Sequence, residues 1–218
     1  MLYLLTTGCP WRQLPTSYPH WRTVYDYFGR WQRDGTLHRL HETLRAAVRR
    51  QAGRHKHPTA GCLDSQSVKS TSVPGSRGYD AFKRLTGRKR HLIVDTQGLL
   101  LAVQVTPANV SETAGAVLVL SRLPPSAKKL RLLWCDNGYF KTAFDSAAQK
   151  RLELRVVERP AEQKGFAVLP RRWVVERTFA WLSRCRRLAR DYETRLQSSE
   201  ALILLAMSRL MLRRLEPQ

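Results

Sequence analysis

The sequence predicts an α/β protein: a mixed sheet with helices on both faces, preceded by a small helical segment. Three observations predict this class: helical apolar spacing before residue 57, short apolar strands after residue 58, and strands that alternate with helices from there on. At 218 residues and 43% hydrophobic, the chain can bury a core in one or two domains. We therefore expect a helical segment over residues 1–57 and a second domain over residues 58–218.

Helical spacing is the main signal of the first segment. Trp21, Val24 and Phe28 recur at intervals of three and four residues, and the range 37–50 continues with Leu40 and Leu44 on one face. Two short helices rich in arginine and aromatic residues suit a DNA reader resembling a helix-turn-helix. They suit a helical cap that packs on the next domain equally well, so both interpretations stay open.

Strands and helices alternate in the second domain. The predicted strands are Ala60–Leu63, His91–Asp95, Leu99–Thr106, Leu130–Cys135 and Leu152–Val157. The turn Thr96-Gln97-Gly98 joins the second and third strands into a hairpin. Helices are predicted over Ser111–Arg122, over Ala143–Arg151, after Arg171 and, as an amphipathic helix that seals the sheet, over Ala201–Leu215. The ribonuclease H-like fold has this order of elements.

The charge of the chain indicates its partner. It carries 38 Lys and Arg against 17 Asp and Glu, a net charge of +21, which favours a polyanion such as nucleic acid. An RNA-binding structural protein and a membrane-surface protein are alternatives, but neither accounts for the placement of the acids. No apolar run reaches the roughly 18 residues of a membrane span. The four cysteines form no Cys-x-x-Cys pair, which fits a reducing cytoplasm.

Three acids stand where metal-assisted phosphate chemistry needs them. Asp64 and Asp136 each end a short apolar strand, and Glu176 begins an arginine-rich helix. In the predicted fold the two strands are neighbours, so the three carboxylates would hold two Mg²⁺ ions, or Mn²⁺ in their place. Each acid also has a simpler interpretation. Asp64 and Asp136 suit turns, and Glu176 suits an ion pair with Arg172 or Arg177.

Several longer stretches resemble one family of proteins. They are Gly8-Cys9-Pro10-Trp11-Arg12-Gln13-Leu14-Pro15, Thr23-Val24-Tyr25-Asp26-Tyr27-Phe28, Asp64-Ser65-Gln66-Ser67-Val68-Lys69, Gly87-Arg88-Lys89-Arg90-His91-Leu92-Ile93-Val94-Asp95, Thr106-Pro107-Ala108-Asn109, Asp136-Asn137-Gly138-Tyr139 and Arg171-Arg172-Trp173-Val174-Val175-Glu176-Arg177-Thr178-Phe179-Ala180-Trp181-Leu182. The chain resembles DDE-type insertion-sequence transposases of the bacterial group numbered five. The resemblance covers nearly the whole chain, and it implies that Asp64, Asp136 and Glu176 are the catalytic acids.

The resemblance also assigns roles around Glu176. The wider family carries Tyr, Arg, Glu and Lys at set intervals, and Arg172 matches the Arg. Leu169 stands at the Tyr position and Ser183 at the Lys position, with Arg184 beside it. Arg184 suits a phosphate contact in place of the lysine, and it suits a solvated surface equally well. Relatives carry a further helical segment before Gly8, so we expect either a truncated element or a start codon assigned too late.

The expected function is that of a DNA transposase in the bacterial cytoplasm, associated with the nucleoid. It would cleave double-stranded DNA at the element ends, transfer the 3′-hydroxyl into target DNA, and act as a homo-oligomer without a membrane. The expected DNA contacts are basic side chains: Arg88, Lys89, Arg90, Arg172, Arg184 and Arg187. The alternatives are an inactive remnant that only binds DNA and a ribonuclease H-like nuclease without strand transfer.

Overall fold

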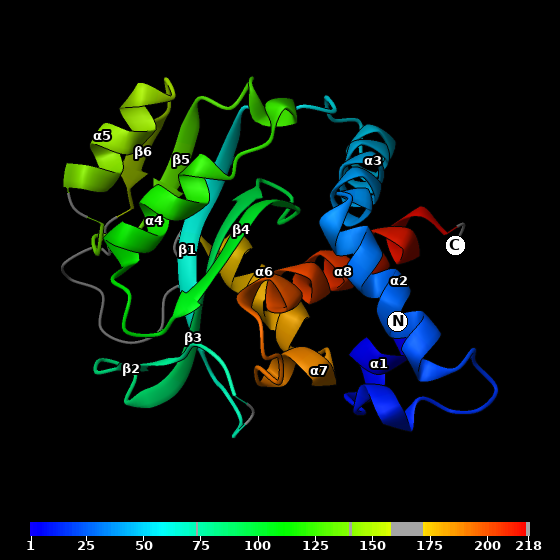
Figure 1. Cartoon of the computed structure of the whole chain (residues 1–218). Coiled ribbons are helices and arrows are strands. Elements are labelled where there is room, and N and C mark those ends of the chain that lie inside the picture. Colours follow the sequence, from blue (N-terminus) through cyan, green and yellow to red (C-terminus); the bar gives the residue numbers. More distant parts are fainter. Residues whose placement is uncertain (73, 140, 158–171, 217–218) are drawn as a thin grey trace. The chain divides into compact units, whose positions relative to one another are not determined.

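The computed structural model describes residues 1–72, 74–139, 141–157 and 172–216 (Figure 1). The chain divides into two compact units. The helical unit comprises residues 1–56, 69–76 and 181–218, and the sheet unit comprises residues 57–68 and 77–180. Among the described residues, no helix is both long and apolar enough to cross a lipid bilayer.

A six-stranded mixed sheet forms the centre of the sheet unit. Its strands are β1 (Ala60–Lys69), β2 (Gly78–Asp80), β3 (Leu85–Asp95), β4 (Leu100–Pro107), β5 (Leu132–Cys135) and β6 (Glu153–Val156). The order is β2-β3-β1-β5-β6, and β4 also pairs with β3. Strand β5 runs parallel to both β1 and β6, whereas β3 is antiparallel to β2 and β4. The predicted α/β class with a ribonuclease H-like mixed sheet is therefore confirmed.

The predicted hairpin joins β3 and β4. Its turn is held by the buried carboxylate of Asp95, which accepts hydrogen bonds of 2.9 Å from the backbone N–H groups of Gln97 and Leu99. Apolar side chains of the sheet then pack on helices α4 (Glu112–Ser121) and α5 (Lys141–Gln149). The hydroxyl of Ser111 accepts a hydrogen bond from the N–H of Ala114, so Ser111 caps α4 as its sequence predicts.

Helix α6 (Trp173–Ser183) is anchored to the β3–β4 turn. The hydroxyl of Thr178 donates to the carbonyl of Gly98 at 2.8 Å, and the guanidinium of Arg177 donates to the carbonyl of Gln97 at 3.1 Å. Thr178 is fully buried, so this contact is shielded from water. The turn thereby holds the middle of α6, the helix that carries Glu176 and most of the last stretch of the family resemblance.

The helical unit contains α1 (Leu2–Thr7), the 3₁₀ turn η1 (Trp11–Gln13), α2 (Trp21–Arg33), α3 (Thr36–Gln51), α7 (Arg186–Ala189) and α8 (Leu196–Leu215). This confirms the helical N-terminal segment. The sequence predicted that the last helix seals the sheet. Within the helical unit, α8 packs chiefly on α3, and also on α1 and α2, because its long buried face matches the apolar face of α3. That α8 seals the sheet remains a prediction. The boundary at residue 57 remains a prediction.

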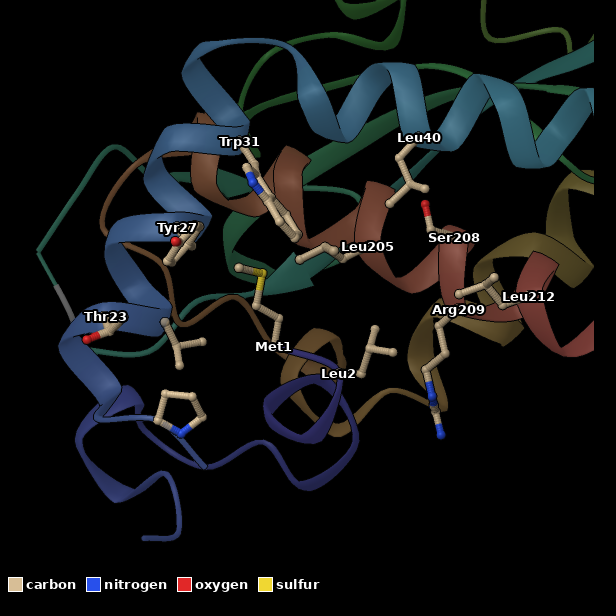
Figure 2. A pocket seen from close by; sticks show the side chains of 12 residues that line it. Met1, Leu2, Thr23, Tyr27, Trp31, Leu40, Leu205, Ser208, Arg209 and Leu212 are labelled. Atoms are coloured by element: carbon tan, nitrogen blue, oxygen red, sulfur yellow. The ribbon is translucent and has the colours of Figure 1, made fainter. Parts of the chain in front are cut away.

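An apolar groove lies within the helical unit (Figure 2). It has a volume of about 390 Å³, and side chains of α1, α2, α3 and α8 line it, among them Leu2, Trp31 and Leu205. Figure 2 shows Arg209 at its border. Its lining is almost wholly apolar and carries no acid, so it is not a place for phosphate chemistry.

Candidate active site

Strand pairing brings the two predicted aspartates to the same edge of the sheet. The parallel register of β1 and β5 pairs Gly61 with Leu133 and Cys62 with Trp134. Two residues further along both strands, the same register sets Asp64 opposite Asp136. The prediction that Asp64 ends its strand is wrong, because β1 continues to Lys69. Asp136 directly follows β5, and the carboxyl end of a parallel strand is where ligands of open α/β sheets usually bind.

One guanidinium joins these carboxylates. Nη2 of Arg172 lies 3.5 Å from Oδ2 of Asp64 and 3.6 Å from Oδ2 of Asp136. The side chain of Arg172 is 15% exposed, so this cation is largely shielded from solvent. The two aspartates therefore form a single anionic site that already holds one positive group. Within the described residues, Nε of Arg172 is buried without a hydrogen-bond partner.

Burial controls the charge of Asp64. It raises the pKa of that carboxyl to about 7, whereas the neighbouring Arg172 and the N–H of Ser65 act in the opposite direction. That N–H donates to Oδ1 of Asp64 at 2.7 Å. The negative charges of Asp136 and Glu112 raise the pKa further. A cation at this edge favours the ionised form of Asp64, because opposite charge offsets the cost of burial.

A third carboxylate, which the sequence did not single out, lies beside the pair. Glu112 begins α4, and its Oε1 accepts a hydrogen bond of 3.0 Å from the hydroxyl of Ser65. Its other oxygen lies so near Gly138 that a Cβ at position 138 would stand 2.5 Å from it. The N–H of Gly138 donates to Oδ1 of Asp136 at 3.0 Å. Glu112 thus contacts the residue after Asp64 and the turn after Asp136.

Tyr139 completes this pocket from the β5–α5 connection. Its side chain is 4% exposed, and its hydroxyl is buried without a hydrogen-bond partner among the described residues. The pKa of Tyr139 is raised well above its usual range, first by burial and then by the charges of Asp64, Glu112 and Asp136. The charges of all three carboxylates therefore act on this hydroxyl, but it bonds to none of them.

Glu176 is exposed on α6, one helical turn after Arg172. It makes no hydrogen bond or ion pair with another described residue, and the structure brings it into contact with neither aspartate. In the described ranges, no three His, Cys, Asp or Glu side chains stand close enough together to enclose a metal ion. The donor set still fits a hard divalent cation, because carboxylate oxygens of Asp64 and Asp136 already converge on one cationic group.

The basic run of β3 lies in the interior. Arg88 and Arg90 are 2% and 1% exposed, and Lys89 is 8% exposed. The ammonium of Lys89 lies 3.4 Å from a carboxylate oxygen of Asp80 and donates to the carbonyl of Val110 at 3.1 Å. The sequence predicted these three cations as DNA contacts. Their burial gives that prediction no support, because buried side chains do not reach a phosphate backbone at the surface.

The basic stretch after α6 contains both exposed and buried side chains. Arg184 is exposed, as is Ser183 at the position where the family carries Lys. Arg187 is 7% exposed; its guanidinium lies 2.7 Å from Oε1 of Glu193 and donates to the carbonyl of Cys9. Arg184 is therefore available to a phosphate, whereas Arg187 has internal partners. Leu169 lies outside the described residues.

Comparison with known families agrees with this geometry. The profile of a family described as "Transposase DDE domain" matches residues 55–211, and a family described as "Putative transposase of IS4/5 family" matches residues 1–41. A relative from Burkholderia cepacia, "Putative transposase for insertion sequence element IS402", is 31% identical over 116 residues. That stretch covers 50% of this chain and 55% of the relative, so the match spans about half the relative's length. No solved structure matches significantly.

Proposed function

Since the chain belongs to the family of transposases with a DDE domain, we propose that it is a DNA transposase that cuts DNA at the ends of an insertion element and joins the freed 3′-hydroxyl to target DNA. Its substrates are double-stranded element ends and target DNA. The net charge of +21 supports a polyanionic partner. The proposal includes action as a homo-oligomer on DNA.

One observation carries this proposal: Asp64 within β1 and Asp136 directly after the neighbouring parallel strand β5 share the guanidinium of Arg172. We assign the catalytic acids as Asp64, Asp136 and Glu176, the last through its place on α6, four residues after Arg172. When bound, Mg²⁺ or Mn²⁺ would activate the attacking oxygen and stabilise the leaving oxygen. The protein's own part is to hold hard oxygen ligands in a shielded position.

Arg172 has a second part in the proposed reaction. Its guanidinium already lies in the anionic site, so a scissile phosphate that enters there meets a donor shaped to bind two phosphate oxygens. The exposed Arg184 extends the positive surface along the chain. We keep Arg184 and Arg172 as the proposed DNA contacts, because the other basic candidates are buried.

A cleavage and joining assay tests the proposal. The full chain is incubated with Mg²⁺, DNA that carries the inverted repeats flanking its own gene, and a target plasmid. We expect nicks at the repeat ends and joined products with the wild type. The yields of nicks and of joined products should each fall by at least about 10²-fold in the variants Asp64→Asn, Asp136→Asn and Glu176→Gln, because each substitution removes a charged ligand. Asp145→Asn, which changes an exposed acid on α5, is the matched control.

The pattern of products separates this function from its alternatives. Joined products support transposition. Nicks without joining would indicate a nuclease, and mobility shifts without nicks would indicate a protein that only binds DNA. Full cleavage by Asp136→Asn would contradict the assignment of the acids.

A further inference from the structure

The charges of three carboxylates, Asp64, Asp136 and Glu112, act on one buried hydroxyl, that of Tyr139. Asp64 and Asp136 share Arg172, whereas Glu112 has no ion-pair partner among the described residues. The negative charge of this pocket therefore exceeds its positive charge. A carboxylate at the start of α4 benefits from the helix dipole, which explains how Glu112 is tolerated. The helix dipole does not explain why the hydroxyl of Tyr139 is buried without a hydrogen-bond partner among the described residues.

The hydroxyl of Tyr139 points to a missing hydrogen-bond partner. Buried hydroxyls are nearly always hydrogen-bonded, and an unsatisfied one destabilises the folded chain. Here the side chain is 4% exposed, and the hydroxyl bonds to none of the three carboxylates whose charges raise its pKa. The carboxylates are strong acceptors and the hydroxyl is a donor, yet no hydrogen bond joins them. A small hydrated group would satisfy both sides.

We infer that this pocket takes a hydrated divalent cation whose waters are held by the carboxylate of Glu112 and the hydroxyl of Tyr139, beside Asp64 and Asp136. The inference rests on the proposed function and adds two residues to its site. Glu112 suits this role because it also contacts Ser65 and the Gly138 turn, the residues that follow the two aspartates. Mg²⁺ and Mn²⁺ suit it because hard cations with oxygen ligands commonly keep several of their waters.

Gly138 supports the close approach of Glu112. Its missing side chain leaves the room that the Oε2 atom occupies, since a Cβ there would lie 2.5 Å from that oxygen and 3.2 Å from Oδ1 of Asp136. The glycine of the Asp136-Asn137-Gly138 turn thus allows two carboxylates to approach the same backbone. This is the geometry expected where both act on one bound cation.

Binding of Mn²⁺ alone, without DNA, tests the inference. Free Mn²⁺ is measured by electron paramagnetic resonance during titration of the full-length protein. We expect Glu112→Gln to raise the Kd for Mn²⁺ about tenfold, the loss typical of a removed outer partner. Gln keeps a side-chain oxygen that can accept the hydrogen bond from the hydroxyl of Ser65. A weaker affinity for Mn²⁺ in this variant therefore reports the loss of the negative charge. Glu153→Gln, an exposed acid of β6, is the matched control and should bind as the wild type does.

Tyr139→Phe is the sharper variant. It removes a hydroxyl that bonds to no described residue, so the midpoint of thermal unfolding should not fall, whereas the Kd for Mn²⁺ should rise several-fold. A purely structural role of Tyr139 predicts no change in Mn²⁺ binding. Wild-type Mn²⁺ affinity in both Glu112→Gln and Tyr139→Phe would overturn the inference.

Asp136→Asn separates the two proposals. If it abolishes Mn²⁺ binding while Glu112→Gln and Tyr139→Phe bind normally, the aspartate site stands and only the added residues are wrong. If Asp136→Asn binds Mn²⁺ as the wild type does, the metal assignment in the proposed function is wrong as well.

Discussion

The hydroxyl of Thr178 donates a hydrogen bond of 2.8 Å to the carbonyl of Gly98, and this contact sets the position of α6 against the sheet. Arg172 lies less than two turns earlier on the same stretch of chain, where it reaches Asp64 and Asp136. Glu176 lies between the anchor and Arg172. A buried contact at a hairpin turn therefore helps to set where two of the proposed site's side chains, Arg172 and Glu176, stand.

Replacing Thr178 with Val should loosen this anchor. Val has nearly the same shape but leaves the buried carbonyl of Gly98 without its donor, so we expect the free energy of unfolding to fall by about 1–2 kcal/mol. DNA cleavage should fall by more than the loss of folded protein explains, because the anchor also positions Glu176 on α6 and Arg172 directly before it. Urea unfolding and the nicking assay measure the two effects. Thr178→Ser keeps the hydroxyl and should retain both the stability and the DNA cleavage of the wild type. If Thr178→Ser and Thr178→Val lose stability and cleavage equally, the hydrogen bond to Gly98 does not position α6.

Arg184 and Arg187 should respond differently to truncation. Arg187 is buried against Glu193, and breaking a buried pair costs about 3–5 kcal/mol, so Arg187→Ala should lower the unfolding midpoint strongly. Arg184→Ala should change stability by less than about 0.5 kcal/mol. If Arg184 contacts a phosphate, its removal should reduce the log–log salt dependence of DNA binding by about 0.9. If Arg187→Ala instead left stability unchanged and reduced the salt dependence of DNA binding, Arg187 would be a DNA contact as the sequence predicted.

Gly115 of α4 marks a tight contact with the sheet. A Cβ at this position would overlap the imidazole ring of His91, which is fully buried in β3 and cannot swing away. We expect Gly115→Ala to destabilise the protein by about 1–3 kcal/mol, as overpacked cores do. Gly29→Ala in α2 is the control, because there the neighbouring atom is the flexible end of Arg33. Adding His91→Ala to Gly115→Ala should cost less than the sum of the two single losses.

Sequence patterns predicted the parts of the site that depend on strand order. Asp64 and Asp136 each follow an apolar run, and the alternation of strands and helices makes those strands parallel neighbours, so their convergence could be foreseen. The strand β2 was missed because it is only three residues long, within a Gly- and Ser-rich loop. Missing β2 also hid the partner of Lys89, since Asp80 lies in that strand.

The partners of individual charges could not be predicted. A sequence shows that Arg88 and Arg90 are cations, but not that β3 has a strand on either side, so a surface position was the natural expectation. Arg172 was predicted as a phosphate contact, and its bond to two aspartates depends on the three-dimensional approach of α6. Glu112 appeared only as the start of a helix. The sequence offered one signal for a role of Glu112 in the site: its position at the start of a helix, shortly after the turn at Asn109.

Protonation of His91 should make stability depend on pH. Burial, with a smaller contribution from the charge of Lys89, lowers its pKa from 6.5 to about 4 in the folded chain. Below pH 6.5 the unfolded chain therefore binds a proton that the folded chain does not, so stability falls as the pH falls from 6.5 toward 4. From the two pKa values, this group should remove about 2 kcal/mol of stability by pH 5.

Urea unfolding at pH 7 and pH 5 measures this dependence. His91→Gln keeps an amide that can bond to the hydroxyl of Thr106, the partner of the imidazole at 3.0 Å, but it cannot take up a proton. This variant should be less stable than the wild type at pH 7 and lose about 2 kcal/mol less between the two pH values. The exposed His55 provides the control, because His55→Gln should leave the wild-type pH dependence intact. An unchanged pH dependence in His91→Gln would show that this imidazole is protonated alike in the folded and unfolded chains.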